Sequence, residues 1–286
     1  MPSLIDIRRR IRSVKNTQQI TKAMKMVSAA KLRRAQDRVI ASRPYGALLR
    51  QVLGNVAAAV ASDERAGSHP LLAQRSEQRI LLVLITSDKG LAGAFNTNLI
   101  KGAQRFVADH AGASVKMELI GRKGRDFFRK RRAAISGDYI GLAAKVLFDD
   151  IAAIARKAIH LYRNEEIDAV YLIYNEFKSV VAQKLTTHRV LPIALPEQAE
   201  PIDYLFAQPP AEMLAALLPK YVEIEFYRAL LESVAAEHAA RMTAMEAATS
   251  NAGEMIDKLT LHMNRVRQAS ITKEIIEVVS GAASAE

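Results

Sequence analysis

The chain has 286 residues, half of them hydrophobic, and carries 41 Lys and Arg against 30 Asp and Glu, a formal net charge of +11. This composition excludes an intrinsically disordered chain, and the length suggests one large or two modest domains. The absence of cysteine excludes disulfides, thiolate nucleophiles and Cys-ligated zinc or iron–sulfur centres. No apolar run reaches the roughly 18 residues that a membrane span requires.

The positive charge is concentrated at the N-terminal end. Residues 1–40 hold 11 Lys and Arg against two acids, a net charge of +9, whereas residues 209–286 hold 7 basic and 11 acidic side chains, a net charge of −4. The two ends therefore carry opposite charge. A basic run is often only a solvated helix face, so its periodicity decides the interpretation.

Apolar residues in the basic end recur at the spacing of one helix face. Neither Pro nor Gly interrupts residues 3–43, which predicts a long helix there. Pro44 predicts a break or kink, after which Ala47 to Ala61 resumes a helical pattern. The predicted apolar stripe comprises Leu4, Ile7, Ile11 and Val14, continued by Ile20, Met24 and Val27.

The other end predicts an even longer helix, with a 3-4 heptad spacing from Pro209 onward and with Arg228 and Thr249 as polar members. About 70 residues give a helix roughly 105 Å long, which cannot bury its stripe against a compact core. We therefore expect an antiparallel coiled coil with the N-terminal helix, whose surplus of about five positive charges predicts acidic surroundings. The stripe comprises Leu217, Tyr221, Ile224, Leu231, Ala235, His238, Met242, Met245, Ala252, Ile256, Leu259, Met263 and Val266.

Between the two ends, the pattern changes to alternating strands and short helices. We expect a small Rossmann-like α/β domain with a mostly parallel sheet and an antiparallel last strand. The predicted fold class is thus α/β plus long helices, with domains at 1–62, 63–208 and 209–286. The predicted strands are Arg79–Thr86, Val115–Gly121, Asp168–Phe177 and Val180–Val190, and the predicted helices are Thr97–His110, Gly121–Arg132 and Ala143–Arg163.

The loop Thr86–Asn96 follows the first predicted strand, where a doubly wound domain can bind phosphate. Lys89 precedes both Gly90 and Gly93, so neither the dinucleotide-binding pattern nor the P-loop pattern is present. We interpret the loop as a structural turn, with a Rossmann-like nucleotide enzyme as the alternative. The chain lacks a nucleophile elbow, a His-Glu-x-x-His motif and a motif with paired carboxylates, so we predict no catalytic residue, no cofactor and no metal.

A basic coiled coil that binds nucleic acid is a second alternative. Residues 1–40 contain no Phe, Tyr or Trp to stack on bases. Their basic side chains also flank an apolar stripe that another helix must cover. We therefore expect no nucleic-acid partner.

Motifs at both ends carry a family resemblance. Leu4–Lys31 forms one such motif, and Arg267–Ser284 forms the other, with Ile-Thr-x-Glu, an acid three residues on and then Gly-Ala. Together with the loop Ser87–Gly93, these segments resemble the gamma subunits of rotary proton-translocating ATP synthases, over essentially the whole chain. The resemblance implies a rotor shaft that serves ATP synthesis and hydrogen ion transport without catalysing a reaction itself.

The resemblance also implies the partners. The coiled coil would turn inside a hexamer of alpha and beta subunits, and the α/β domain would bind the epsilon subunit and the ring of c subunits, with a delta subunit also in the assembly. The chain would lie at the cytoplasmic face of a bacterial inner membrane, attached through its partners only, and the start Met1-Pro2 favours a bacterial source. The implied contacts with beta are Arg267, Gln268, Thr272, Glu274, Arg8, Arg9, Lys25 and Met24, and those with the c-ring or epsilon are Tyr204, Leu205 and Phe206.

Overall fold

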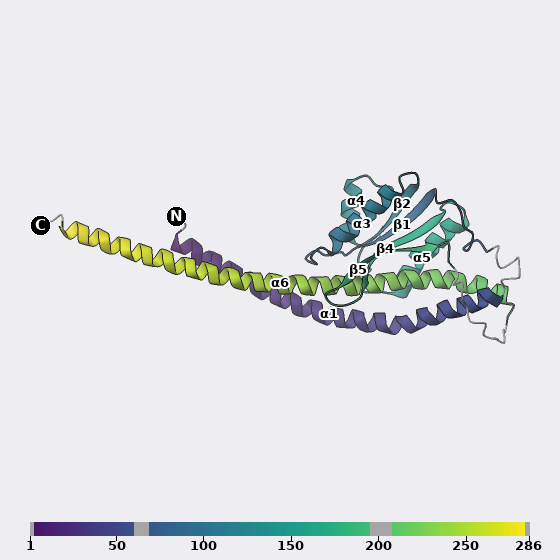
Figure 1. Ribbon diagram of the computed structural model, residues 1–286, viewed down its shortest axis with the longest axis horizontal. Helices are drawn as coiled ribbons and strands as arrows, with labels where there is room; N and C mark the ends of the chain where they lie inside the picture. Colours follow the sequence, from purple (N-terminus) through teal and green to yellow (C-terminus); the bar gives the residue numbers. More distant parts are fainter. Residues whose placement is uncertain (1–2, 60–68, 195–207, 284–286) are drawn as a thin grey trace. The chain divides into compact units, whose positions relative to one another are not determined.

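The computed structural model describes residues 3–59, 69–194 and 208–283. The chain forms two compact units, which we call the terminal unit (Met1–Ser28 with Met242–Glu286) and the central unit (Ala29–Arg241). Helices α1 and α6 contribute to both. The elements are α1 (Leu4–Ala59), β1 (Arg79–Ile85), α3 (Phe95–Asp109), β2 (Ser114–Ile120), α4 (Arg122–Lys130), β3 (Ile135–Tyr139), α5 (Phe148–Arg163), β4 (Ala169–Phe177), β5 (Gln183–Leu191) and α6 (Pro210–Ala283) (Figure 1).

Helix α1 runs without a break to Ala59, although the sequence predicts an interruption at Pro44. A proline inside a helix removes one backbone hydrogen bond and costs about 3 kcal/mol. Packing on both sides of it offsets this cost, because Val39, Leu49 and Leu53 are buried in the central unit. Of the break or kink predicted at Pro44, the break is therefore wrong, because tertiary packing outweighs the local preference of proline.

The described part of the central unit contains a five-stranded sheet in the order β3-β2-β1-β4-β5. The first four strands pair in parallel and β5 pairs antiparallel with β4, which confirms the expected mostly parallel sheet. In its middle, Leu82 of β1 pairs with Met117 of β2 on one side and with Tyr171 of β4 on the other. Strands β1 and β4 are buried along almost their whole length because helices cover both faces.

Right-handed crossovers place α3 and α4 on one face of the sheet and α5 on the other. On the first face, the ring of Phe106 in α3 lies 4.9 Å from that of Tyr171. Helix α6 joins α5 on the second face, where the rings of Phe148 and Tyr227 meet edge to face at 5.4 Å. The central-unit part of α6 is therefore packed against the α/β domain rather than standing apart from it.

Two elements differ from the sequence-based expectation. Strand β3 is not predicted, because its segment contains Gly and Asp, which are rare in strands, and because it lies half exposed at the sheet edge. Helix α5 begins at Phe148 instead of Ala143, since Gly141 has a φ of 87° and Leu147 is extended. The other predicted strands and helices of this unit are confirmed, with bounds that shift by at most three residues.

Candidate functional site

In the terminal unit, α1 and α6 pair through small and polar side chains. Thr21 Oγ1 lies 2.8 Å from Thr249 Oγ1, and Lys25 Nζ forms an ion pair with Glu246 at 2.6 Å. Gln18 Nε2 also donates to the carbonyl of Thr249 at 3.4 Å. The residue number rises along α1 while that of its partner falls along α6, so the helices are antiparallel, as the sequence predicts.

The apolar stripe predicted along the start of α1 is only partly correct. Ile7 is buried, as expected, but Ile20 and Val27 expose 60% and 56% of their surface. The face that meets α6 continues from Ile7 in steps of three and four residues through Thr21 and Ser28, which are both buried. Small polar residues occupy the seam here, which leaves the larger aliphatic side chains on the outer face.

In the central unit, α6 carries buried carboxylates, each held by a basic side chain. These residues are absent from the sequence-based predictions, although a signal exists: acids recur within the most apolar stretch of the helix. Buried charges in proteins are paired, and here the partners come from α1, α5 and α6. The pairs are Arg156–Glu223 (2.8 Å), Arg50–Glu225 (3.1 Å), Arg43–Glu232 (3.2 Å) and Arg241–Glu237 (2.7 Å).

Glu225 receives the largest number of partners among these described carboxylates. Besides Arg50 of α1, Arg228 of α6 lies 3.3 Å away and His188 Nε2 of β5 lies 3.4 Å away. Burial would raise the pKa of Glu225, but the nearby imidazole of His188 and the charges of Arg228 and Arg50 outweigh it and hold that pKa below its usual value. The carboxylate therefore joins three elements while ionised.

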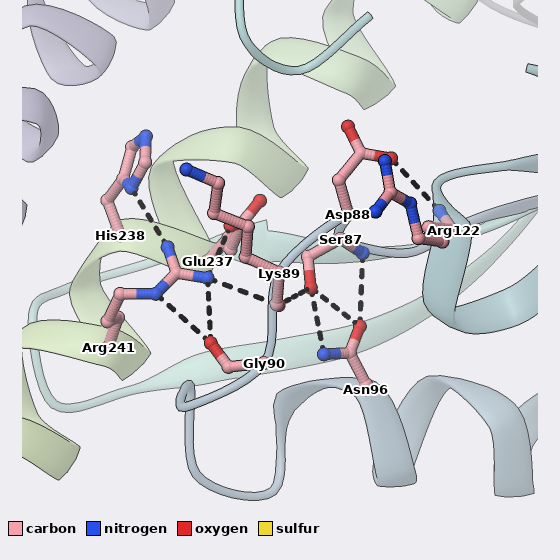
Figure 2. A network of polar contacts seen from close by, with 9 residues as sticks. All are labelled: Ser87, Asp88, Lys89, Gly90, Asn96, Arg122, Glu237, His238 and Arg241. Atoms are coloured by element: carbon pink, nitrogen blue, oxygen red, sulfur yellow. Dashed lines mark hydrogen bonds and ion pairs between the residues drawn. The ribbon is translucent and has the colours of Figure 1, made fainter. Parts of the chain in front are cut away.

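The loop after β1 is fixed by its own polar groups (Figure 2). Asn96 Oδ1 accepts the backbone N–H of Ser87 at 3.0 Å, and Ser87 Oγ donates to the carbonyl of Lys89 at 2.6 Å. The Asp88 carboxylate accepts the backbone N–H of Arg122, at the start of α4, at 3.0 Å. These bonds give the loop the structural role that we infer from its sequence.

Arg241 of α6 contacts the same loop (Figure 2). Its guanidinium donates to the carbonyl of Gly90 from Nε at 3.3 Å and from Nη2 at 3.2 Å, and to the carbonyl of Lys89 from Nη2 at 3.3 Å. His238 lies beside it, with Nδ1 3.4 Å from Arg241 Nη1. Burial, and then the charges of Arg241 and Lys31, lower the pKa of His238 to about 4, so its imidazole is neutral at physiological pH.

A cleft of about 260 Å³ lies between α1, α6 and the loop. Val146, Leu231 and Val234 form part of its apolar wall. Basic residues gather around it, and the side chains of the following four form no ion pair or hydrogen bond with another described residue: Lys31, Arg34, Arg38 and Lys89. The cleft is therefore electropositive.

The residues assigned to the C-terminal contact with beta lie on the last turns of α6. Arg267, Gln268, Thr272 and Glu274 are all exposed. Thr272 Oγ1 donates to the carbonyl of Gln268 at 2.9 Å, one turn earlier in the same helix. Their exposure leaves these side chains accessible to a partner.

The residues assigned to the N-terminal contact are less uniform. Arg8 and Arg9 are exposed, whereas Met24 and Lys25 are half-buried, and Lys25 pairs with Glu246 of the same chain. The proposed c-ring residues 204–206 lie outside the described residues.

Neither a membrane span nor a metal site is found in the described part of the chain. No helix there is long and apolar enough to cross a membrane. Residues 3–59, 69–194 and 208–283 also contain no group of three or more His, Asp or Glu side chains arranged to hold a metal ion.

Comparisons with known proteins identify the family. A family model described as ATP synthase matches residues 3–285. The chain is 79% identical over 286 residues to the ATP synthase gamma chain of Solibacter usitatus (strain Ellin6076), covering 100% of both chains. It is 52% identical to that of Anaeromyxobacter sp. (strain Fw109-5), covering 99% of both.

Solved structures give the same result. The chain resembles a chain in the central stalk and c-ring structure of Tetrahymena thermophila mitochondrial ATP synthase, with a TM-score of 0.61 and 26% identity, covering 80% of this chain and 99% of that one. A chain from the Euglena gracilis mitochondrial ATP synthase shares the fold at a TM-score of 0.67 and 18% identity, with 98% and 94% covered. The chain belongs to the ATP synthase gamma chain family.

Proposed function

We propose that this chain is the central rotor stalk of ATP synthase and couples ion-driven rotation of a c-subunit ring to ATP synthesis in the beta subunits. The observation that carries the proposal is the 79% identity to a bacterial gamma chain over the full length of both. The similar Tetrahymena chain comes from a structure of the central stalk and c-ring of mitochondrial ATP synthase, which supports the same role here. As a gamma chain, this protein is a non-catalytic subunit of the enzyme complex.

Asymmetry of the shaft provides the mechanism. A single helix pair inside a ring of alternating alpha and beta subunits presents a different face to each beta subunit, and so favours a different conformation in each. Moving a two-state site from 1:99 to 99:1 takes about 5.5 kcal/mol of differential contact energy. Rotation then moves each set of contacts from one beta subunit to the next.

Exposed aliphatic side chains support a protein sleeve around the helices. Ile20 and Val27 of α1 and Ile275 and Val278 of α6 are all more than half exposed. Such side chains on the outer face of a long helix favour a covering protein surface. Alpha and beta subunits would supply it, with beta contacting the exposed Arg8 and Arg9 at one end of the chain and Arg267, Gln268, Thr272 and Glu274 at the other.

The remaining partners follow from the family. We infer that Tyr204, Leu205 and Phe206 contact the c-ring or the epsilon subunit and that a delta subunit completes the assembly. The chain then lies at the cytoplasmic face of a bacterial inner membrane and associates with it through these partners. The proposed domain bounds remain 1–62, 63–208 and 209–286.

Stoichiometric reconstitution tests the rotor assignment. Co-expression with alpha and beta subunits should yield a complex with one copy of this chain per hexamer, measured by native mass spectrometry. A chain that stays outside the hexamer, or enters it in several copies, would contradict the proposal.

A charge reversal tests the acidic surroundings in the same assay. The double substitution Arg8→Glu and Arg9→Glu should reduce incorporation into the hexamer, because the reversed charges would face acidic partner surfaces. The matched control, Arg129→Glu with Lys130→Glu on the exposed end of α4, makes the same change of charge away from the helix pair. Equal incorporation of both variants would count against these contacts.

A further inference from the structure

We propose that Arg241 is a positioning residue of the rotor, which fastens the loop Ser87–Gly93 to α6 and thereby places Lys89 among the basic side chains of α1. The inference rests on the proposed function, because it concerns how the rotor presents charge to a partner subunit. All the residues that carry it belong to the central unit.

The geometry of Arg241 is that of a clamp on the main chain. Its guanidinium donates to two successive carbonyls, those of Lys89 and Gly90, at 3.2 to 3.3 Å, while Nη2 also pairs with Glu237 at 2.7 Å. The side chains of Arg241 and Glu237 are each only 9% exposed. A planar guanidinium can reach these acceptors from Nε and Nη2 together, with the two N–H groups of Nη2 shared among three acceptors, whereas the ammonium of lysine is a point charge.

The loop needs such a restraint at its tip. Ser87, Asp88 and Asn96 fix the part of the loop that adjoins β1 and α3, as described above. Beyond them, Leu91 has a φ of 61° and is 63% exposed. A non-glycine residue in the left-handed region persists only where its surroundings hold it. Arg241 holds the two residues directly before Leu91, and so keeps the tip in this conformation.

Burying the ion pair between Arg241 and Glu237 costs desolvation free energy. Burial raises the pKa of Glu237, and the nearby charge of Arg241 opposes this shift without cancelling it. A buried ion pair of this kind adds little stability compared with an apolar pair, so we assign it a role in fixing one arrangement. The arrangement that it fixes is the path of the loop.

The consequence of that path is a single basic surface. Lys89 lines the same cleft as three exposed cations of α1, and none of the four is paired with a described residue. The acids of the cleft are already engaged: Glu237 binds Arg241, and Asp88 accepts the backbone N–H of Gly141 at 3.0 Å. The four free charges therefore suit an acidic surface of a partner subunit, and Arg241 keeps the fourth of them in register with the other three.

Hydrogen exchange in the full chain tests the clamp directly. The variant Arg241→Met leaves Glu237 buried without its partner, so we pair it with Glu237→Gln in a double variant that removes both charges. In the double variant, amides of residues 88–93 should exchange about tenfold faster than in the parent chain, with the sheet amides of β1 unchanged. Unchanged exchange at 88–93 would overturn the proposal.

Coupling in the reconstituted enzyme tests the consequence. In vesicles, protons moved per ATP hydrolysed should fall by about twofold or more in the double variant and partly recover in Arg241→Lys, which keeps the charge but loses the fork. Lys89→Ala should reproduce the loss of coupling without faster loop exchange. Normal coupling in the double variant, beside a parent chain that assembles and couples, would overturn the inferred role of Arg241 in the rotor; a parent chain that does not assemble would overturn the proposed function instead.

Discussion

The same two helices pair in both units, but they do so with different chemistry. In the central unit, α6 buries Glu225 and Glu232, and α1 supplies Arg50 and Arg43 to them. In the terminal unit, the seam contains hydroxyl groups, and its ion pair Lys25–Glu246 is largely exposed. Buried pairs are directional and costly to break, whereas exposed pairs contribute little. The central pairing is thus specified by buried charges of the chain itself, while the terminal pairing leaves aliphatic side chains exposed on its outer face.

The largest expected effect comes from breaking the buried pairing at its best-connected residue. Glu225→Ala leaves Arg50 and Arg228 without their shared carboxylate and should lower the free energy of unfolding by about 3 kcal/mol. Urea denaturation of the purified chain, followed by circular dichroism, measures it. The control Glu254→Ala removes an exposed acid of the terminal unit and should change the stability by less than about 0.5 kcal/mol. Equal effects of the two substitutions would contradict the claim that the buried pairs of the central unit contribute more stability than the exposed charges of the terminal unit.

Acid should weaken the central unit through the same carboxylate. A carboxyl group whose pKa is lower in the folded protein stabilises the fold above its unfolded pKa of about 4.3, and this stability is lost as the pH falls through the folded pKa. The pKa of Glu225 is lowered, so this group should make the protein less stable as the pH falls below about 4. Urea midpoints at pH 3 and pH 6 measure the change. Glu225→Ala should reduce this pH dependence, and a variant with the parent's full dependence would contradict the assignment.

A smaller effect is expected where a backbone group shares the carboxylate. Arg43→Met removes the basic partner of Glu232, but the backbone N–H of Phe177 still donates to Glu232 at 3.1 Å. The loss should therefore be about 1 to 2 kcal/mol, less than for Glu225→Ala. Chemical denaturation ranks the two. A larger loss for Arg43→Met would mean that the α1 contact, not the link to β4, holds Glu232.

In the terminal unit, replacing both threonines of the Thr21–Thr249 contact should cost less stability than replacing either one alone. Thr21→Val alone leaves the Thr249 hydroxyl without one of its contacts and should cost about 1 kcal/mol, and Thr249→Val should cost a similar amount. The double variant replaces both partners by groups of the same shape, so it should return to within about 0.5 kcal/mol of the parent. A double-mutant cycle measures the coupling, and strictly additive losses would contradict a direct hydroxyl contact.

The smallest effect on the isolated chain is expected on the outer face. Ile20→Ser and Val27→Ser should change its stability by less than about 0.5 kcal/mol, because both side chains are already exposed. Ile7→Ser, at a buried position of the same helix, is the control that should destabilise. Incorporation into the alpha and beta hexamer should nevertheless decrease for the exposed pair, and unchanged incorporation would argue against a protein sleeve at this face.

The periodicity of apolar residues predicts the fold of the α/β domain well, but it predicts poorly which face of α1 meets α6 in the terminal unit. The alternation of strands and helices between Arg79 and Arg189 predicts a mostly parallel sheet, because buried strands and amphipathic helices each have their own period. The seam is harder, since the apolar residues Ile20 and Val27 match a heptad as well as Thr21 and Ser28 do. The sequence-based prediction places Ile20 and Val27 against α6 because they are apolar. In the structure, the small side chains of Thr21 and Ser28 occupy that face instead and let the helices approach.

The clamp could not be predicted because its partners are main-chain atoms. Arg241 binds carbonyls about 150 residues away in sequence. Every residue has a backbone carbonyl, so the residue type does not reveal which one accepts a hydrogen bond. The buried acids of α6 are different, since acids inside an apolar run do signal unusual burial. The c-ring residues 204–206 rest on family resemblance and stay a prediction.

The register of the antiparallel pair also bears on which changes of length the chain can tolerate. Deleting one residue from α1 would rotate every later side chain of that helix by about 100°, and would turn Arg43 and Arg50 away from their glutamates together. Such a deletion would require a matching one in α6, at a distant point of the gene. Beyond Ser270, the side chains of residues 271–279 in α6 are exposed, and none of them forms a buried ion pair with α1 among the described residues. Among the pairings within the chain, those of residues 29–59 should therefore constrain its length most strictly.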